Sequence, residues 1–143
     1  WQLFSSKMNS FVDENVFSAN GWRAMTYGDV MPFQMVHTFK GDNENMNKWR
    51  RMQRELRDNY PQRENTSFAT GGINVGGPSN EANNWIVYGF KTYADYMSNW
   101  ADNRKYREDN PKYVKDREKM NAEIDYSEIE PVKKFMRYLV KQW

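Results

Sequence analysis

The 143-residue chain contains no cysteine. This absence excludes disulfide bonds, zinc–thiolate sites, iron–sulfur clusters and thiol nucleophiles. Histidine is almost as scarce, because His37 is the only one, so a metal site built from several histidines is excluded as well. We therefore predict a protein without a metal site.

Long apolar runs and a strong excess of one charge are also missing. No apolar segment approaches the roughly 18 residues of a membrane-spanning helix. The formal net charge is only +2, with acidic and basic residues interleaved, which argues against nucleic-acid binding. The chain starts at Trp1 instead of Met, so we expect a processed or incomplete N-terminus. We expect a soluble protein, cytoplasmic or exported after removal of a signal.

Branched aliphatic residues are few. The chain has three Leu and four Ile against 9 Met and 23 aromatic residues. A core of Met and aromatic side chains can repack around adaptable cavities, because Met is flexible and Tyr and Trp must place a polar edge. The same composition also fits a filled, aromatic-rich core.

What the chain does contain is an internal repeat, residues 17–59 and 68–110. Nine of the 43 aligned positions are identical without a gap, where composition alone would give roughly two or three. The offset is 51 residues at every identical pair. A constant offset through strand-like and helix-like segments predicts a duplicated supersecondary unit. The identical pairs include Phe17 and Phe68, Gly21 and Gly72, Val36 and Val87, Phe39 and Phe90, Met46 and Met97, and Trp49 and Trp100.

Each copy is predicted to form two strands and a helix. Alternating apolar residues indicate the strands, and a 3.6-residue period indicates the helices. Asp42 is the expected N-cap of the first helix, and Thr92 to Asp95 forms a capping box before the second. The predicted strands are 21–27, 33–40, 66–75 and 85–91, and the helices are 43–59 and a segment from residue 92 that ends before Pro111.

Three further helices are expected outside the repeat. Residues 1–15 and 111–120 have weak helical patterns. The strongest pattern covers 129–143, where apolar residues recur at helical spacing after the capping box Ser127 to Glu130 and Pro131. We expect this C-terminal helix to dock on the domain.

The predicted order of elements indicates an α+β fold. We expect one domain, residues 1–143, built from two ferredoxin-like halves with antiparallel sheet, and a C-terminal helical extension over 111–143. Two such sheets facing each other would enclose a small barrel.

A short motif in the first copy resembles a known family. Gly21-Trp22 with Gly28, followed by Val36-His37-x-Phe39 and a helix, is similar to the NIPSNAP pattern of the dimeric α+β barrel group. The second copy has Tyr88 in place of the histidine and Ile73 in place of the tryptophan. The resemblance implies a tandem barrel in one chain, in a group whose activities vary widely, and a homo-oligomer is one expected form.

His37 and Tyr88 are the candidate catalytic residues. The related cyclase-like barrels use a histidine with a tyrosine to remove a proton from an enclosed substrate. The resemblance implies the same role for His37, with Tyr88 or Tyr27 as its partner, and Tyr88 occupies the equivalent position in the second copy. His37 could also be the axial ligand of a haem. A structural histidine, bonded within the core, is the alternative.

The other candidate residues would line a ligand cavity. Trp22, Tyr27 and Trp85 would provide aromatic walls, and Arg23 could hold a carboxylate, although an isolated strand arginine is often solvated.

Three functions stay open at this point. The first is binding of a small apolar or aromatic ligand, without a cofactor. The second is a barrel enzyme that uses His37, either cofactor-free like the cyclases and monooxygenases or haem-dependent. The third is a non-catalytic assembly protein with a filled barrel.

Overall fold

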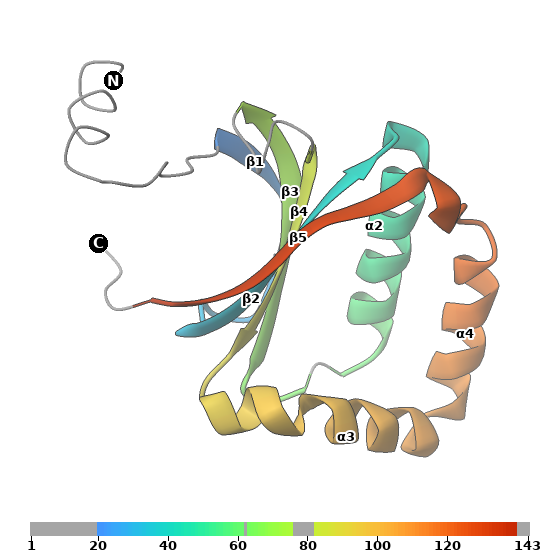
Figure 1. Cartoon of the computed structure of the whole chain (residues 1–143). Helices are drawn as coiled ribbons and strands as arrows, with labels where there is room; N and C mark the ends of the chain where they lie inside the picture. Colours follow the sequence, from blue (N-terminus) through green and yellow to red (C-terminus); the bar gives the residue numbers. More distant parts are fainter. Residues whose placement is uncertain (1–19, 62, 76–81, 140–143) are drawn as a thin grey trace.

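The computed structural model describes residues 20–61, 63–75 and 82–139, which form an antiparallel sheet and three α-helices (Figure 1). The protein is therefore an α+β protein, as predicted. The predicted helix over 1–15 and the predicted loop over 76–80 lie outside the described residues. The elements are β1 (Asn20–Tyr27), β2 (Phe33–Gly41), α2 (Asn43–Asn59), β3 (Thr66–Val75), β4 (Asn84–Phe90), α3 (Tyr93–Asp109), α4 (Pro111–Asn121), a short 3₁₀ turn η2 (Tyr126–Glu128) and β5 (Ile129–Tyr138).

The five strands pair in the order β1-β3-β4-β2-β5, and every pair is antiparallel. The segment from β2 to β5 has the β-α-β-β-α-β connectivity of one ferredoxin-like unit, with the second crossover made of α3 and α4. Strand β1 extends this unit at the β3 edge. The described strands thus form one sheet, in which β3 and β4 of the second copy lie between β1 and β2 of the first.

The helices cover one face of the sheet, and the strand registers show which residues point to it. One row of paired residues crosses all five strands: Tyr27, Phe68, Tyr88, Met35 and Met136. The neighbouring row on the same face is Met25, Thr70, Ile86, His37 and Lys134. Because side chains alternate along a strand, the residues between these rows point to the other face.

Helix α2 supplies most of the apolar contacts with this face. Its buried Met46, Trp49, Met52 and Leu56 recur at helical spacing and pack in the core with Met25, Phe68 and Ile86. The helix begins after Asp42, as predicted, and the Asp42 carboxylate accepts hydrogen bonds from the backbone N–H groups of Glu44 (2.8 Å) and Asn45 (3.0 Å).

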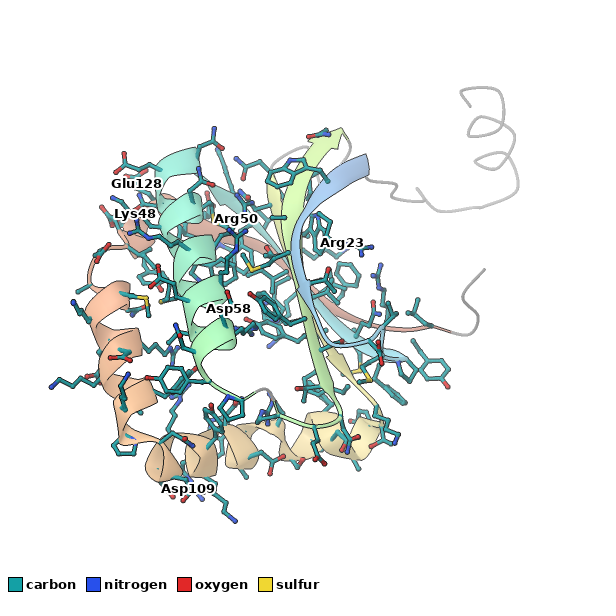
Figure 2. All side chains as sticks on the ribbon, turned by 180° about the vertical axis from the view of Figure 1, so that it is seen from behind. Arg23, Lys48, Arg50, Asp58, Asp109 and Glu128 are labelled. Atoms are coloured by element: carbon teal, nitrogen blue, oxygen red, sulfur yellow. The ribbon has the colours of Figure 1, made fainter. Side chains whose placement is uncertain are left out.

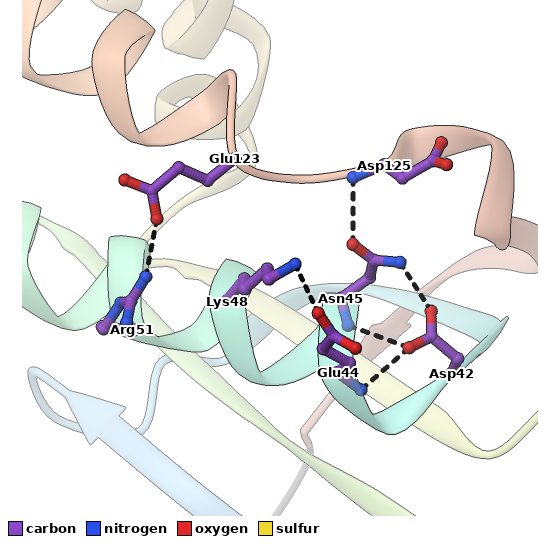
Figure 3. A network of polar contacts seen from close by, with 7 residues as sticks. All are labelled: Asp42, Glu44, Asn45, Lys48, Arg51, Glu123 and Asp125. Atoms are coloured by element: carbon purple, nitrogen blue, oxygen red, sulfur yellow. Dashed lines mark hydrogen bonds and ion pairs between the residues drawn. The ribbon is translucent and has the colours of Figure 1, made fainter.

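The same cap ties α2 to the segment before β5 (Figure 3). The Asn45 side chain donates to Asp42 (2.8 Å) and accepts from the backbone N–H of Asp125 (3.0 Å). One and a half turns later, Arg51 pairs with Glu123 at 2.7 Å. These contacts fix the end of α4 beside the first half of α2.

Two adjacent glycines in β3 make room for two tryptophan rings on opposite faces. A Cβ on Gly72 would clash with Nε1 of Trp22. A Cβ on Gly71 would clash with the Trp22 backbone carbonyl and would lie 2.7 Å from Cζ2 of Trp85. Close ring approach therefore explains why glycine occurs within this strand. On the helix side, the Arg50 guanidinium lies 5.1 Å from the Trp22 ring centre and donates hydrogen bonds to Asn84 and to the Gly71 carbonyl.

Helices α3 and α4 frame the sheet without burying a residue of their own. Helix α3 crosses one end of the sheet, and α4 runs beside α2 (Figure 1). Neither has a side chain that is fully buried. The predicted capping box at Thr92 and Asp95 is present, and α4 confirms the predicted helix after Pro111. Between these two helices and the sheet lies the cavity that is described below.

The predicted C-terminal helix is wrong. Residues 129–138 form β5, which pairs with the outer edge of β2, and Asp125 caps η2 where the Ser127 capping box was expected. An unpaired β2 edge would leave a row of backbone groups without partners, and β5 satisfies them. Pro131, which the helix prediction placed in a first turn, lies at a register shift of an edge strand, where a missing N–H is tolerated.

The α2 contacts predict a large difference between two tryptophans. Trp49 is 8% exposed in the core, whereas Trp100 on α3 is 72% exposed. We expect Trp49→Ala to lower the free energy of unfolding by about 3–5 kcal/mol. Trp100→Ala should change it by no more than about 0.5 kcal/mol. Urea unfolding of both variants checks this, and equal losses would contradict the assigned core.

Candidate functional site

A cavity of about 350 Å³ lies between the sheet and the helical frame. Its walls come from the end of α2, the segment after it, α3 and α4. Its floor is part of the helix-covered sheet face: Tyr27, Phe68, Tyr88, Met35, His37 and Lys134 from the two rows above, with Thr66 and Phe90 from the next row. Most lining side chains are aromatic or apolar. The aromatic ones are Tyr27, Tyr60, Phe68, Tyr88, Phe90, Tyr96, Tyr106 and Tyr113.

His37 and Tyr88 meet on the cavity floor. They lie on the adjacent strands β2 and β4. Tyr88 pairs with Met35, two residues before His37, so Tyr88 and His37 are diagonal neighbours on one face of the sheet. Their ring centres are 5.7 Å apart in an edge-on arrangement. The Phe39 ring lies on the other side of the imidazole at 6.0 Å. The predicted pair is therefore in one place, although its members come from different halves of the sequence.

Basic side chains surround the same space. Arg57 of α2 places Cζ 3.7 Å from the centre of the Phe68 ring and donates a 2.6 Å hydrogen bond to the Gln53 side chain. Arg63 donates to the Asn99 side chain of α3. Lys134 reaches the cavity from β5, in the same row as His37.

Tyrosine hydroxyls close the helical side of the cavity. Tyr27 donates to the Asp58 carboxylate at 2.8 Å, and Tyr106 donates to the Pro61 carbonyl at 3.3 Å. Tyr113 of α4 contacts both Tyr60 and Tyr106 edge-on, with ring centres 5.3 and 5.2 Å away. These contacts join α2, α3 and α4 at one point.

Burial controls the protonation of the floor residues. It lowers the pKa of His37, with a smaller contribution from the positive charge of Lys134. It raises the pKa of Tyr88, against the opposing charge of Arg57. At neutral pH the floor therefore holds a neutral imidazole beside a protonated phenol. The imidazole can accept a proton, and the phenol can donate one.

The other predicted site residues do not all reach this cavity. Tyr27 lines it. Trp22 is on the same face of the sheet, but it stacks with Arg50 and does not line the cavity. Arg23 and Trp85 pair with Gly71, on the row that points to the opposite face. Figure 2 shows Arg23 projecting on the side of β1 away from Arg50 and α2.

The basic residues Arg57, Arg63 and Lys134 were missed by the sequence reasoning. Arg57 had a signal, because it follows the core residue Trp49 by eight positions and so lies on the same side of α2. Arg63 and Lys134 had none, since one belongs to an irregular segment and the other to a strand that was predicted to be a helix.

Among the residues that the structure describes, no group of three or more His, Asp or Glu side chains could hold a metal ion. Within the same residues, no helix is long and apolar enough to cross a membrane. Comparisons with protein-family models, curated proteins and solved structures gave no match.

The lowered pKa of His37 predicts a specific pH dependence of stability. A folded-state pKa below the unfolded value of 6.5 means that the unfolded chain binds the proton more tightly. Stability should therefore fall as the pH drops through about 6.5 toward the folded pKa. We expect the free energy of unfolding of His37→Gln to fall less than that of the wild type between about pH 7 and pH 5.

Urea unfolding of both proteins at several pH values measures this difference. Carboxylates that titrate in both proteins, such as Asp42 and Asp125, cancel in the comparison. Parallel pH curves for the two proteins would show that His37 gains its proton as easily in the folded state as in the unfolded chain.

Proposed function

We propose that this protein binds a small, largely aromatic or apolar organic molecule in the cavity between the sheet and the helices. The observation that carries the proposal is the cavity itself, about 350 Å³ with ring-lined walls and a few converging polar groups. Its volume falls in the range of about 300–1,000 Å³ that small-molecule sites occupy.

The cavity is partly open to solvent, as small-molecule sites in clefts are, so a ligand can reach it from the surface. Two packed features border this space, the apolar core under α2 and the ring contacts of Tyr113 with Tyr60 and Tyr106. A bound molecule would supply the contacts that the cavity walls otherwise lack.

Native mass spectrometry of the protein purified from its natural source, with an absorption spectrum, tests the proposal. We expect a bound species whose mass identifies a small organic molecule. Asn103→Trp should abolish the bound species, because Asn103 lines the cavity from α3 and the larger ring would fill it. Lys105→Trp is the matched control, since Lys105 is exposed on the same helix and does not line the cavity.

Ligand retention in Asn103→Trp would place the binding elsewhere, and an empty wild-type protein would contradict the proposal. That second result would favour a non-catalytic assembly role.

A second candidate function is catalysis of proton transfer on the bound molecule. The specific support is the neutral His37 in contact with Tyr88, a base next to a hydrogen-bond donor that could stabilise a developing negative charge. Haem ligation by His37 stays a prediction. The rings of Phe39 and Tyr88 already contact the imidazole, so we propose no haem-dependent reaction at His37.

Deuterium exchange tests this second function. The molecule recovered from the protein is incubated in heavy water with catalytic amounts of wild type, His37→Gln or Tyr88→Phe. Wild type should exchange a carbon-bound proton at least about 100-fold faster than His37→Gln, the usual contribution of a general base. Equal exchange rates for wild type and His37→Gln would contradict the role of His37 as the base. The ligand-binding proposal would still stand.

We also propose that the chain is a duplicated, NIPSNAP-like barrel protein, in which a second copy of the chain supplies the facing sheet. Two facts support the duplication: β2 and β4 begin 51 residues apart, at Phe33 and Asn84, and α2 and α3 are each 17 residues long. The sheet face opposite the helices carries an apolar row of Ala69, Val87, Val36 and Phe135. A homodimer mass in the native spectrum would support this arrangement, and a monomer at micromolar concentration would contradict a barrel made from two copies.

A further inference from the structure

We infer that the ligand of this cavity is an organic anion, an aromatic carboxylate whose ring rests on the tyrosine and phenylalanine floor and whose charge is held by Arg57 and Arg63. The inference rests on the proposed function and names the class of molecule that the site selects.

The first argument is the charge of the lining. Arg57, Arg63 and Lys134 reach the cavity from three different elements or segments, and His37 adds a fourth basic group. No Asp or Glu occurs among the described residues that line it. Because the charged side chains of the described lining are all basic, the cavity attracts a negative charge.

The nearest carboxylates lie outside the lining and are engaged there. Asp58 accepts the Tyr27 hydroxyl, and Asp116 accepts Lys112 at 2.7 Å. Asp102 is 3.9 Å from Arg63, with a side chain that is 52% exposed. Asp102 attracts Arg63 and offsets part of its charge, but at 3.9 Å from a half-exposed carboxylate this offset stays smaller than the effect of burial.

The second argument is the cost of assembling these cations. Burial lowers the pKa of both Arg57 and Arg63, and the positive charge of Arg63 adds to the lowering at Arg57. Both effects oppose the charged guanidinium, and the negative charge of a bound anion would offset them. The Gln53 and Asn99 side chains hold the two guanidinium groups in fixed orientations. Preorganised donors of this kind favour a planar, two-oxygen acceptor.

The third argument concerns the rest of the ligand. The floor beside Arg57 consists of rings, with Phe68 buried under the guanidinium and Tyr88 next to it in the same row. A free inorganic anion would make no use of the ring surface that faces the cavity. An aromatic body with one carboxylate satisfies the rings and the cations together.

The experiment compares two probes that differ only in charge, 2-naphthoate and 2-naphthamide, by isothermal titration calorimetry at neutral pH, where the carboxyl is ionised. We expect wild type to bind the naphthoate at least about tenfold more tightly than the naphthamide, the usual worth of a charged hydrogen bond. Raising the salt concentration should reduce only the naphthoate affinity.

Two variants test the assigned residues. Arg63→Gln and Arg57→Gln should each weaken naphthoate binding by about tenfold and leave naphthamide binding within about threefold. Arg51→Gln is the matched control, because Arg51 is an arginine of α2 that pairs with Glu123 and does not line the cavity. Should Arg57→Gln fail to fold, Arg63→Gln and the salt dependence still decide the result.

Equal binding of the two probes by wild type would overturn the anion inference and leave the proposed ligand-binding function standing. Binding of neither probe would also overturn it, and the native mass spectrum then decides separately whether the proposed function survives. A charge preference that persists in Arg63→Gln and in a folded Arg57→Gln would overturn the assignment of these two residues.

Discussion

The packing of α2 on the sheet is the interaction on which the rest of this structure depends. Four apolar residues of that helix, Met46, Trp49, Met52 and Leu56, reach the strands, and α3 and α4 bury none of their own. The Asp42–Asn45–Asp125 cap then fixes where α4 ends and where β5 begins. Strand β5 then pairs with the outer edge of β2. The position of α2 therefore affects both the covered face of the sheet and this edge.

The cavity follows from the same packing. The apolar side of α2 ends near Leu56, and the chain leaves this helix before Pro61. Helix α3, which follows β3 and β4, crosses one end of the sheet (Figure 1). Beyond that point the sheet face is covered by tyrosines and arginines from three segments instead of a packed helix face. Large rings with polar edges can border a space that aliphatic side chains would fill. The composition of the chain, rich in aromatics and poor in Leu and Ile, fits this arrangement.

Local patterns predicted most elements well and failed at one. The strands and helices between residues 20 and 121 were predicted within a few residues, because their alternation, caps and turn residues act over short distances. The segment 129–138 has a helical spacing of apolar residues, yet it forms β5. Its conformation was decided by an unpaired edge about 95 residues away in sequence, which no local pattern reports, as the bond from Thr38 to the Lys133 carbonyl illustrates.

The candidate site divides in the same way. The sequence by itself determined that His37 would share a strand face with Met35 and Phe39, and Tyr88 with Ile86 and Phe90, because strand periodicity fixes which residues of one strand point to the same side. Only the tertiary structure decided that these two rings are in contact, that Arg57, Arg63 and Lys134 join them, and that Arg23 and Trp85 point to the opposite face. Periodicity assigns a residue to one of two faces, but the strand order, the strand registers and the path of the helices decide which residues meet, and these depend on contacts between segments far apart in the chain.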